Sequence, residues 1–270
     1  MADQSPLALN DLLAQTIRFL TLDSVPGGWI GQPPEWPGEY LFGGFVVAQA
    51  LMAACRDAPA GTRIHSMHAY FLRPVTSGAP VGYEVSDLRA GRTFTTRRVQ
   101  AIQVERPVFD MVCSFTSDTE GYVYDLPAPV TFPSVADGPV EPGPGPWESV
   151  RLGPSEASED GTRESTHRMW FRIPARAPDD PHLHAALLGF ASDWTGVGGR
   201  PLYLQGDTQG MVSLDHAAWF HRPARVDSWL SYDVHSLVNA GGRGLLRGVI
   251  RTLDGQIVVS VAQEMLLAVI

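Results

Sequence analysis

The chain has 270 residues, of which 44% are hydrophobic and 18% are charged, and its formal net charge is −9. The composition is that of a globular protein, the length suits two domains better than one, and the negative charge disfavours general attraction to nucleic acid or to an anionic membrane. All 20 basic residues are arginine. The absence of lysine excludes Schiff-base chemistry, a pyridoxal phosphate linkage and a P-loop.

Neither a membrane span nor a secretory signal is expected. No stretch approaches the roughly 20 apolar residues that a span needs, and the first residues lack the basic and apolar regions of a signal peptide. We therefore expect a cytoplasmic protein without membrane association. Cys55 and Cys113 lie among apolar neighbours and are too few for a disulfide framework or a cysteine-rich metal site. We expect two core thiols, no metal and no cofactor.

The first half of the chain predicts helices followed by a sheet. Apolar residues at near-helical spacing predict a helix over 7–20, followed by an irregular crossing up to about Tyr40. Residues 42–55 are apolar nearly all round and predict a buried helix, with Gly43 and Gly44 exposing backbone N–H groups at its start. Strand-like runs follow at about 63–73, 81–89, 92–105 and 107–116.

A linker and a second series of elements follow. Residues 117–146 are rich in proline, glycine and acids, which predicts an extended linker. Expected next are strands near 147–152 and 166–173, an apolar helix from Pro181, and strands near 202–221, 228–237, 243–253 and 256–268. We predict an N-terminal domain over 1–116, this linker, and a C-terminal domain over 147–270.

The two halves repeat each other at an offset of 149 residues. HAYFLRP at 68–74 is answered by HAAWFHRP at 216–223, and agreement continues without a gap over about 35 residues. Such agreement indicates internal duplication. The predicted fold is α+β: a tandem double hot-dog in which each unit is a long central helix wrapped by a curved antiparallel sheet.

Three polar residues of the second copy stand where the first copy has Gly44, Ile64 and Ser114. They are Asp193, Ser213 and Gln263. Each interrupts an apolar pattern, and a buried carboxylate is costly unless it is hydrogen-bonded, so we expect the three to share a partner. If that partner is water, Asp193 is the general base and the other two hold the water near an activated acyl carbon. Backbone N–H groups near a helix start would then bind the carbonyl oxygen.

Strand alternation gives the neighbouring residues other roles. It places Ser213 with Asp215 on one face of its strand and His216 on the opposite face, so Ser213 and His216 should not cooperate. Four histidines lie in strands beside aromatic residues without a carboxylate-rich ligand set, which favours a structural role over catalysis or metal binding. They are His65, His68, His216 and His221. A structural role at strand ends is likewise expected for Arg73 and Arg222.

Several segments resemble the type II acyl-CoA thioesterases from about residue 8 to the C-terminus. They are FGGFVVAQAL, HSMHAYFLRP, FTTRRVQAIQ, LLGFASD, SLDHAAWFHRP and VAQE. The resemblance implies a double hot-dog that hydrolyses acyl-CoA to free fatty acid and CoA, with Asp193, Ser213 and Gln263 activating water in the second unit. It also implies a homo-oligomer of double hot-dogs. The segment after Asp193, WTGVGGRPLYLQGD, is shorter and richer in glycine than in similar family members, so we expect a different acyl channel.

Two other functions stay open. One is a hot-dog enoyl-CoA hydratase or dehydratase with Asp215 and His216 as acid and base, which strand alternation disfavours because neighbours face opposite sides. The other is a non-catalytic acyl-CoA binding module, which would not need a base buried in its site. The chain has no GxSxG elbow, which argues against an α/β-hydrolase route. One catalytic site per chain is predicted, with the first copy as structural partner and cleft wall.

Overall fold

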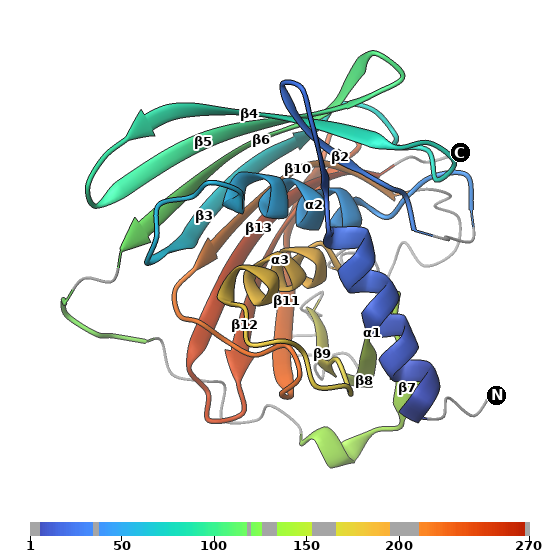
Figure 1. Cartoon of the computed structure of the whole chain (residues 1–270). Coiled ribbons are helices and arrows are strands. Elements are labelled where there is room, and N and C mark those ends of the chain that lie inside the picture. Colours follow the sequence, from blue (N-terminus) through green and yellow to red (C-terminus); the bar gives the residue numbers. More distant parts are fainter. Residues whose placement is uncertain are drawn as a thin grey trace.

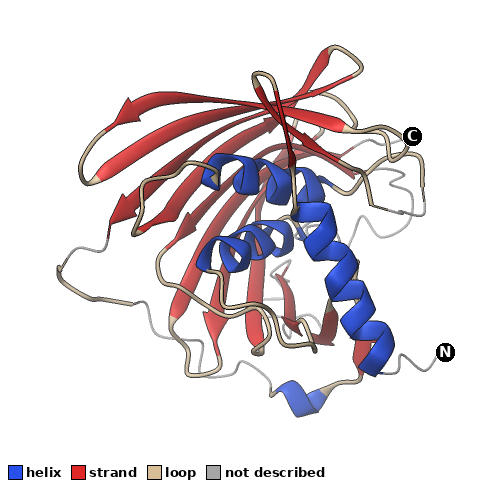
Figure 2. Cartoon of the chain, in the orientation of Figure 1, coloured by secondary structure: helices blue, strands red, loops and turns tan. Residues whose placement is uncertain are grey.

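The computed structural model describes residues 6–34, 38–117, 120–125, 134–152, 166–194 and 211–267. Within them, thirteen strands form one antiparallel sheet that curves around two helices, with a third helix alongside (Figures 1 and 2). The strand order is β1-β2-β4-β5-β6-β3-β10-β13-β12-β11-β9-β8-β7. No helix in these ranges is long and apolar enough to cross a membrane.

The elements of the first half follow the predicted order. They are α1 (Pro6–Leu20), β1 (Asp23–Val25), β2 (Gly28–Gly31), α2 (Gly43–Cys55), β3 (Thr62–Phe71), β4 (Val81–Ala90), β5 (Phe94–Gln103) and β6 (Arg106–Ser117). The two helices and the four long strands are confirmed. The expectation of an irregular crossing is wrong for β1 and β2, which form a short hairpin that adds to the sheet beside β4.

The second half holds the remaining elements. They are the 3-10 helix η1 (Val135–Asp137), β7 (Val140–Pro142), β8 (Glu148–Leu152), β9 (Thr166–Arg172), α3 (Pro181–Ser192), β10 (Met211–Phe220), β11 (Leu230–Ala240), β12 (Arg243–Thr252) and β13 (Ile257–Leu267). Residues 202–210 of one predicted strand lie outside the described residues. The end of the predicted linker is wrong, because β7 pairs with β8 at the sheet edge, where an exposed strand tolerates Pro142.

The strands repeat at the predicted offset. Strands β10, β11 and β12 each begin 149 residues after β3, β4 and β5 respectively. In the middle of the sheet β3 pairs antiparallel with β10, and His68 faces Ala217, its own counterpart in the repeat. The first and second halves of the chain are therefore joined in the sheet through this antiparallel pair.

The helices do not share this offset. Helix α3 begins 138 residues after α2. The offset is smaller than 149 because the connection from the helix to the next strand is longer in the second half, where it covers 193–210, than in the first, where it covers 56–61. Asp193 therefore follows the last turn of α3, whereas Gly44 lies in the first turn of α2. The predicted equivalence of Asp193 and Gly44 is wrong.

Helices α2 and α3 pack side by side in opposite directions inside the sheet (Figure 1). A Cβ at Gly189 of α3 would lie 2.5 Å from Leu51 Cδ1, and a Cβ at Gly44 would lie 2.5 Å from the Phe190 carbonyl oxygen. Glycine at both crossing points allows this close approach. Apolar residues of both helices and of the sheet form one buried cluster.

The two helix starts differ in capping. Asp180 caps α3, since its Oδ1 accepts from the backbone N–H groups of His182 and Leu183, and Pro181 occupies the first turn. Helix α2 has no side-chain cap at Phe42. Its first N–H groups are therefore available to another part of the molecule.

The close helix crossing yields a stability prediction. Gly189→Leu should lower the free energy of unfolding by about 1–3 kcal/mol, because the new side chain must displace Leu51 and Val47 in a packed core. Chemical denaturation measures the change. Gly78→Leu, at an exposed site with open space around the position of a Cβ, is the matched control. Equal stability of the two variants would contradict the packing described.

Candidate active site

Asp193, Ser213 and Gln263 come together from three elements. Asp193 caps the C-terminus of α3, Ser213 lies in β10 and Gln263 lies in β13. Gln263 Nε2 donates to Asp193 Oδ1 at 2.6 Å and to Ser213 Oγ at 2.7 Å. Ser213 Oγ donates to the same Asp193 oxygen at 3.2 Å. Each of the three side chains therefore touches the other two.

The carboxyl group of Asp193 is held in an apolar interior. Its exposed fraction is 2%, and burial raises its pKa to about 7, against the opposing effects of hydrogen bonds from Gln263, Ser213 and the backbone N–H of Gly44. The uncapped start of α2 thus supplies a donor to Asp193. A carboxyl group with a pKa near neutrality can both accept and return a proton at physiological pH.

A β-bulge changes the predicted faces of β10. The pairing of β10 with β13 shifts register between Ser213 and Asp215, which adds one residue and reverses the alternation beyond it. His216 therefore faces the interior, 1% exposed, on the same face of the sheet as Ser213 and Gln263. The prediction that His216 lies opposite to Ser213 is wrong. The same shift recurs in β3 between Ile64 and Ser66.

His216 extends the polar group behind Gln263. Ser192 Oγ donates to the Gly189 carbonyl oxygen at 2.8 Å, so the 2.8 Å contact between His216 Nε2 and Ser192 Oγ makes the imidazole the donor. Burial lowers the pKa of His216 to about 3. The imidazole is therefore neutral, and its ring hydrogen is directed at Ser192.

The remaining predicted residues make packing contacts. His65 lies edge-on to Phe94 and His68 edge-on to Trp219, with ring centroids 5.4 and 5.2 Å apart, and His221 Nε2 lies 2.9 Å from Ser260 Oγ. At the repeated strand ends, arginine side chains donate to backbone carbonyl oxygens: Arg73 to Pro107 and Arg222 to Ile257.

Sequence reasoning missed two contributors to the site, Gly44 and His216. The signal for Gly44 was present in a helix that begins with two glycines and has no capping side chain before it. A Cβ at the adjacent Gly43 would lie 2.7 Å from Asp193 Oδ2 and from Phe71 Cε1, so the backbone passes directly beside the carboxyl group. The inward orientation of His216 could not be predicted, because the pattern of apolar residues does not show where a strand contains a bulge.

Comparison with known proteins places the chain in a family. Residues 32–116 match the acyl-CoA thioesterase N-terminal domain, and residues 120–267 match the acyl-CoA thioesterase C-terminal domain. The chain belongs to the acyl-CoA thioesterase family. Acyl-CoA thioesterase 2 of Haemophilus influenzae is 30% identical over 280 aligned residues, covering 95% of this chain and 98% of that protein. Human acyl-coenzyme A thioesterase 8 is 30% identical, covering 84% and 80% respectively.

Solved structures agree with the family and with a hot-dog fold. The acyl-CoA thioesterase II TesB2 of Mycobacterium marinum superposes with a TM-score of 0.84 at 32% identity, covering 94% of this chain and 98% of that one. A hot-dog protein of unknown function from Alicyclobacillus acidocaldarius superposes with a TM-score of 0.76 at 18% identity, covering 94% and 98%.

The raised pKa of Asp193 predicts a pH-dependent stability. Its folded-state pKa lies above the unfolded value, so Asp193 costs no stability below about pH 4 and an increasing amount as pH rises towards 7. The unfolding free energy of Asp193→Asn minus that of wild type should therefore increase by up to about 4 kcal/mol between pH 4 and pH 8. Urea titrations across this range measure the difference. Asp11→Asn, an exposed carboxylate of α1, is the control, and a constant difference for Asp193→Asn would contradict the assignment.

Proposed function

We propose that the protein hydrolyses acyl-CoA thioesters to free fatty acid and CoA at Asp193, Ser213 and Gln263. One observation carries the proposal: a buried carboxyl group with a pKa near 7 accepts hydrogen bonds from a hydroxyl and an amide on two other elements. Membership of the acyl-CoA thioesterase family supports the substrate class, since the relatives are named for that activity.

The proposed chemistry needs no covalent intermediate. Asp193 takes a proton from water, and the water oxygen attacks the thioester carbonyl carbon. The carbon–sulfur bond breaks, the CoA sulfur leaves as a thiolate, and the proton on Asp193 restores the thiol. Ser213 and Gln263 fix both the carboxyl group and the water, so the attacking oxygen is oriented before the reaction. His216, neutral and fixed by Ser192, pairs across the strands with Gln263.

The proposal includes the arrangement of the chain. The units are a hot-dog over 1–116 around α2, a linker that ends before the edge strand β7, and a C-terminal hot-dog around α3 that β7 joins. One site per chain is expected, because the strand pairing puts Ile64 at the position of Ser213 and Cys113 at the position of Gln263. Cytoplasmic location and assembly into homo-oligomers stay predictions.

The hydratase alternative finds less support. His216 is 1% exposed and its pKa is lowered to about 3, so it is not an imidazolium at neutral pH, and its one ring hydrogen is donated to Ser192. Asp215 Oδ1 accepts from the backbone N–H of Glu264, which ties that carboxylate to the sheet. A binding module without turnover would have no use for a base with a pKa near 7.

Replacement of the base tests the proposal directly. Asp193→Asn should lower kcat for thiol release from acyl-CoA by about 10²–10⁴-fold, because the amide cannot take a proton from water. Asp215→Asn is the matched control and should keep wild-type turnover, since its amide oxygen can still accept from Glu264. Hydration of crotonyl-CoA is measured in parallel. Unchanged thiol release in Asp193→Asn, or hydration that depends on Asp215, would contradict the proposal.

The pH profile gives a second, independent test. With Asp193 as base, kcat/KM should rise with pH and level off above about 7, because only the ionised carboxylate accepts the proton. Ser213→Ala removes a hydrogen bond that lowers this pKa. In this variant the rise of kcat/KM should therefore occur at higher pH, and its plateau value should be lower than in wild type. A variant that only destabilised the fold would have a lower plateau of kcat/KM, and the pH at which kcat/KM rises would not change.

A further inference from the structure

A second cleft lies at the other end of α3 from Asp193. Its volume is about 560 Å³, and it opens between the first turns of α3, the start of β3 and the segment after β10. The lining is mainly apolar, with Ile64, Ala185, Leu188 and Phe220 contributing, and arginines including Arg63 and Arg222 also line it. Pockets for small organic ligands have this size and character.

This second cleft is the repeat counterpart of the catalytic site. At the offset of 149, its Ile64 corresponds to Ser213, and its Phe220 corresponds to Phe71, which lies beside Asp193 and Gly43. His184 and Asp193 are nine residues apart on α3, about 14 Å along the helix axis. The cleft therefore occupies, in the first half of the repeat, the place that the Asp193 group occupies in the second.

The chemical groups for hydrolysis are missing at this end. Ile64 stands at the position of Ser213. The strand pairing places Cys113 at the position of Gln263, because Cys113 pairs with Met67 and Arg97 as Gln263 pairs with His216 and Leu246. The predicted equivalence of Ser114 and Gln263 is therefore wrong. The acid in the lining, Asp179, is paired with Arg225 and Arg176. A ligand in this cleft would therefore be bound without being cleaved.

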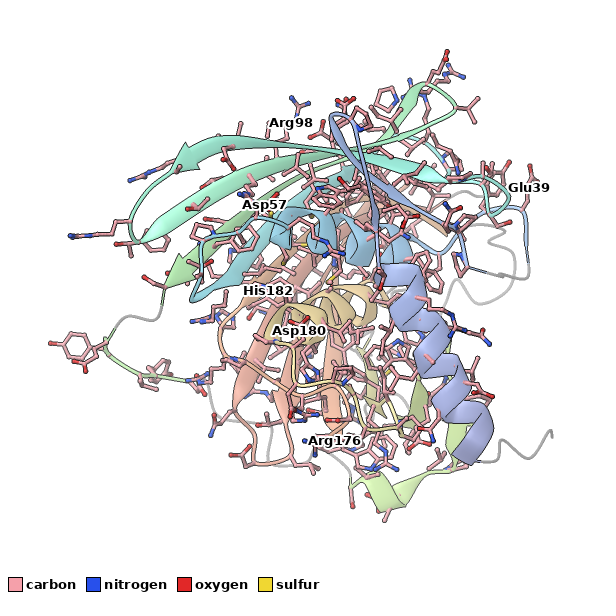
Figure 3. All side chains as sticks on the ribbon, in the orientation of Figure 1. Glu39, Asp57, Arg98, Arg176, Asp180 and His182 are labelled. Atoms are coloured by element: carbon pink, nitrogen blue, oxygen red, sulfur yellow. The ribbon has the colours of Figure 1, made fainter. Side chains whose placement is uncertain are left out.

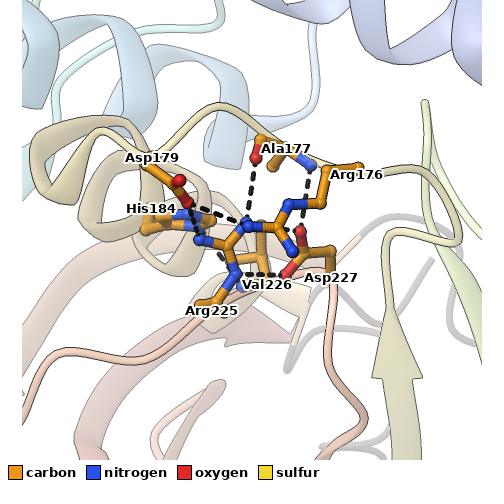
Figure 4. A network of polar contacts seen from close by, with 7 residues as sticks. All are labelled: Arg176, Ala177, Asp179, His184, Arg225, Val226 and Asp227. Atoms are coloured by element: carbon orange, nitrogen blue, oxygen red, sulfur yellow. Dashed lines mark hydrogen bonds and ion pairs between the residues drawn. The ribbon is translucent and has the colours of Figure 1, made fainter.

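His184 supplies a hydrogen-bond donor that has no partner in the described structure. Its Nδ1 accepts from the Val226 backbone N–H at 3.3 Å, so the ring hydrogen of the neutral imidazole is on Nε2 (Figure 4). Burial, and then Arg225, lower the pKa of His184, which keeps the ring neutral. Nε2 is buried and unpaired, and the imidazole lines the cleft.

The polar groups around His184 are otherwise paired with one another. Arg225 is bound by Asp227 and Asp179 and donates to the Ala177 carbonyl oxygen (Figure 4). Asp180 and His182, at the start of α3 (Figure 3), bond to the α3 backbone and to the Thr62 carbonyl oxygen. A buried donor left unpaired costs stability, and a ligand oxygen would remove that cost.

From this geometry we infer that the second cleft is a non-hydrolytic binding site for an acyl chain that ends in a carbonyl or carboxylate oxygen. The chain would pack on Ile64, Ala185, Leu188 and Phe220, and the oxygen would accept from His184. Free fatty acid and the acyl part of acyl-CoA share this chemistry. The inference concerns a site separate from the catalytic one and does not depend on the proposed hydrolysis.

Binding stoichiometry tests the inference. Isothermal titration of the full chain with dodecanoate, below its micelle concentration, should give two equivalents for wild type. Ala185→Phe fills the cleft and should leave one equivalent. Ala14→Phe, the same change at a half-exposed helical alanine outside the cleft, is the matched control and should keep two. Ala224→Phe on the opposite wall repeats the test should Ala185→Phe fail to fold.

The choice of probe identifies the ligand. Dodecylammonium has the same chain without an acceptor oxygen and should bind the cleft at least about tenfold more weakly than dodecanoate, given the value of one hydrogen bond. S-(2-oxododecyl)-CoA, which has a carbonyl but no cleavable thioester, distinguishes the CoA-bound source from the free acid. An equivalent of either probe that Ala185→Phe removes supports the site, whether wild type binds one or two. A stoichiometry that Ala185→Phe leaves unchanged for both probes would overturn it, whatever the turnover of the enzyme.

Discussion

The structure depends on one buried carboxyl group, that of Asp193. It lies at the C-terminal end of α3, where the helix dipole opposes a negative charge, and it is almost fully excluded from water. Three donors from three places compensate for this: the Gln263 amide, the Ser213 hydroxyl and the Gly44 N–H. Gly44 belongs to the first copy, so the first copy contributes a hydrogen bond as well as a cleft wall. This contact requires the close helix crossing that Gly44 and Gly189 permit.

The bulge in β10 is the second constraint on the site. An unbroken strand would place Ser213 and His216 on opposite faces, and the Gln263 amide could then meet only one of them. The extra residue places both side chains on the face that carries Gln263, where Ser213 bonds to the amide and the neutral His216 bonds to Ser192. The same register shift recurs at Ile64 to Ser66 in β3, so the irregularity belongs to the backbone of both halves.

The sequence predicted well where a pattern is local. Apolar runs and turn residues located the helices and long strands, and gap-free repetition located the strand offset. Asp193, Ser213 and Gln263 were identified because each is a polar residue in an otherwise apolar stretch. The failures come from features without a local pattern. The longer connection after α3 shifts the helices against the strands, so Asp193 and Gly44 are partners and not counterparts. A bulge turned His216 inward, and an exposed edge strand needs no apolar alternation, so β7 was read as linker.

The C-termini of α2 and α3 contact groups of opposite charge preference. At the C-terminus of α2, Arg97 donates to the carbonyl oxygens of Ala54, Arg56 and Asp57, a cation placed where the helix dipole favours one. Its repeat counterpart is Leu246, and at the C-terminus of α3 a carboxyl group stands where the dipole disfavours it. Asp180 caps the start of α3, whereas the start of α2 is left uncapped for Asp193. One end of the pair is thus arranged for stability and the other retains an unfavourable group, which is the arrangement that the proposed base at Asp193 would require. Because both halves of the chain share one sheet and one core, the favourable end can offset what the buried carboxyl group costs.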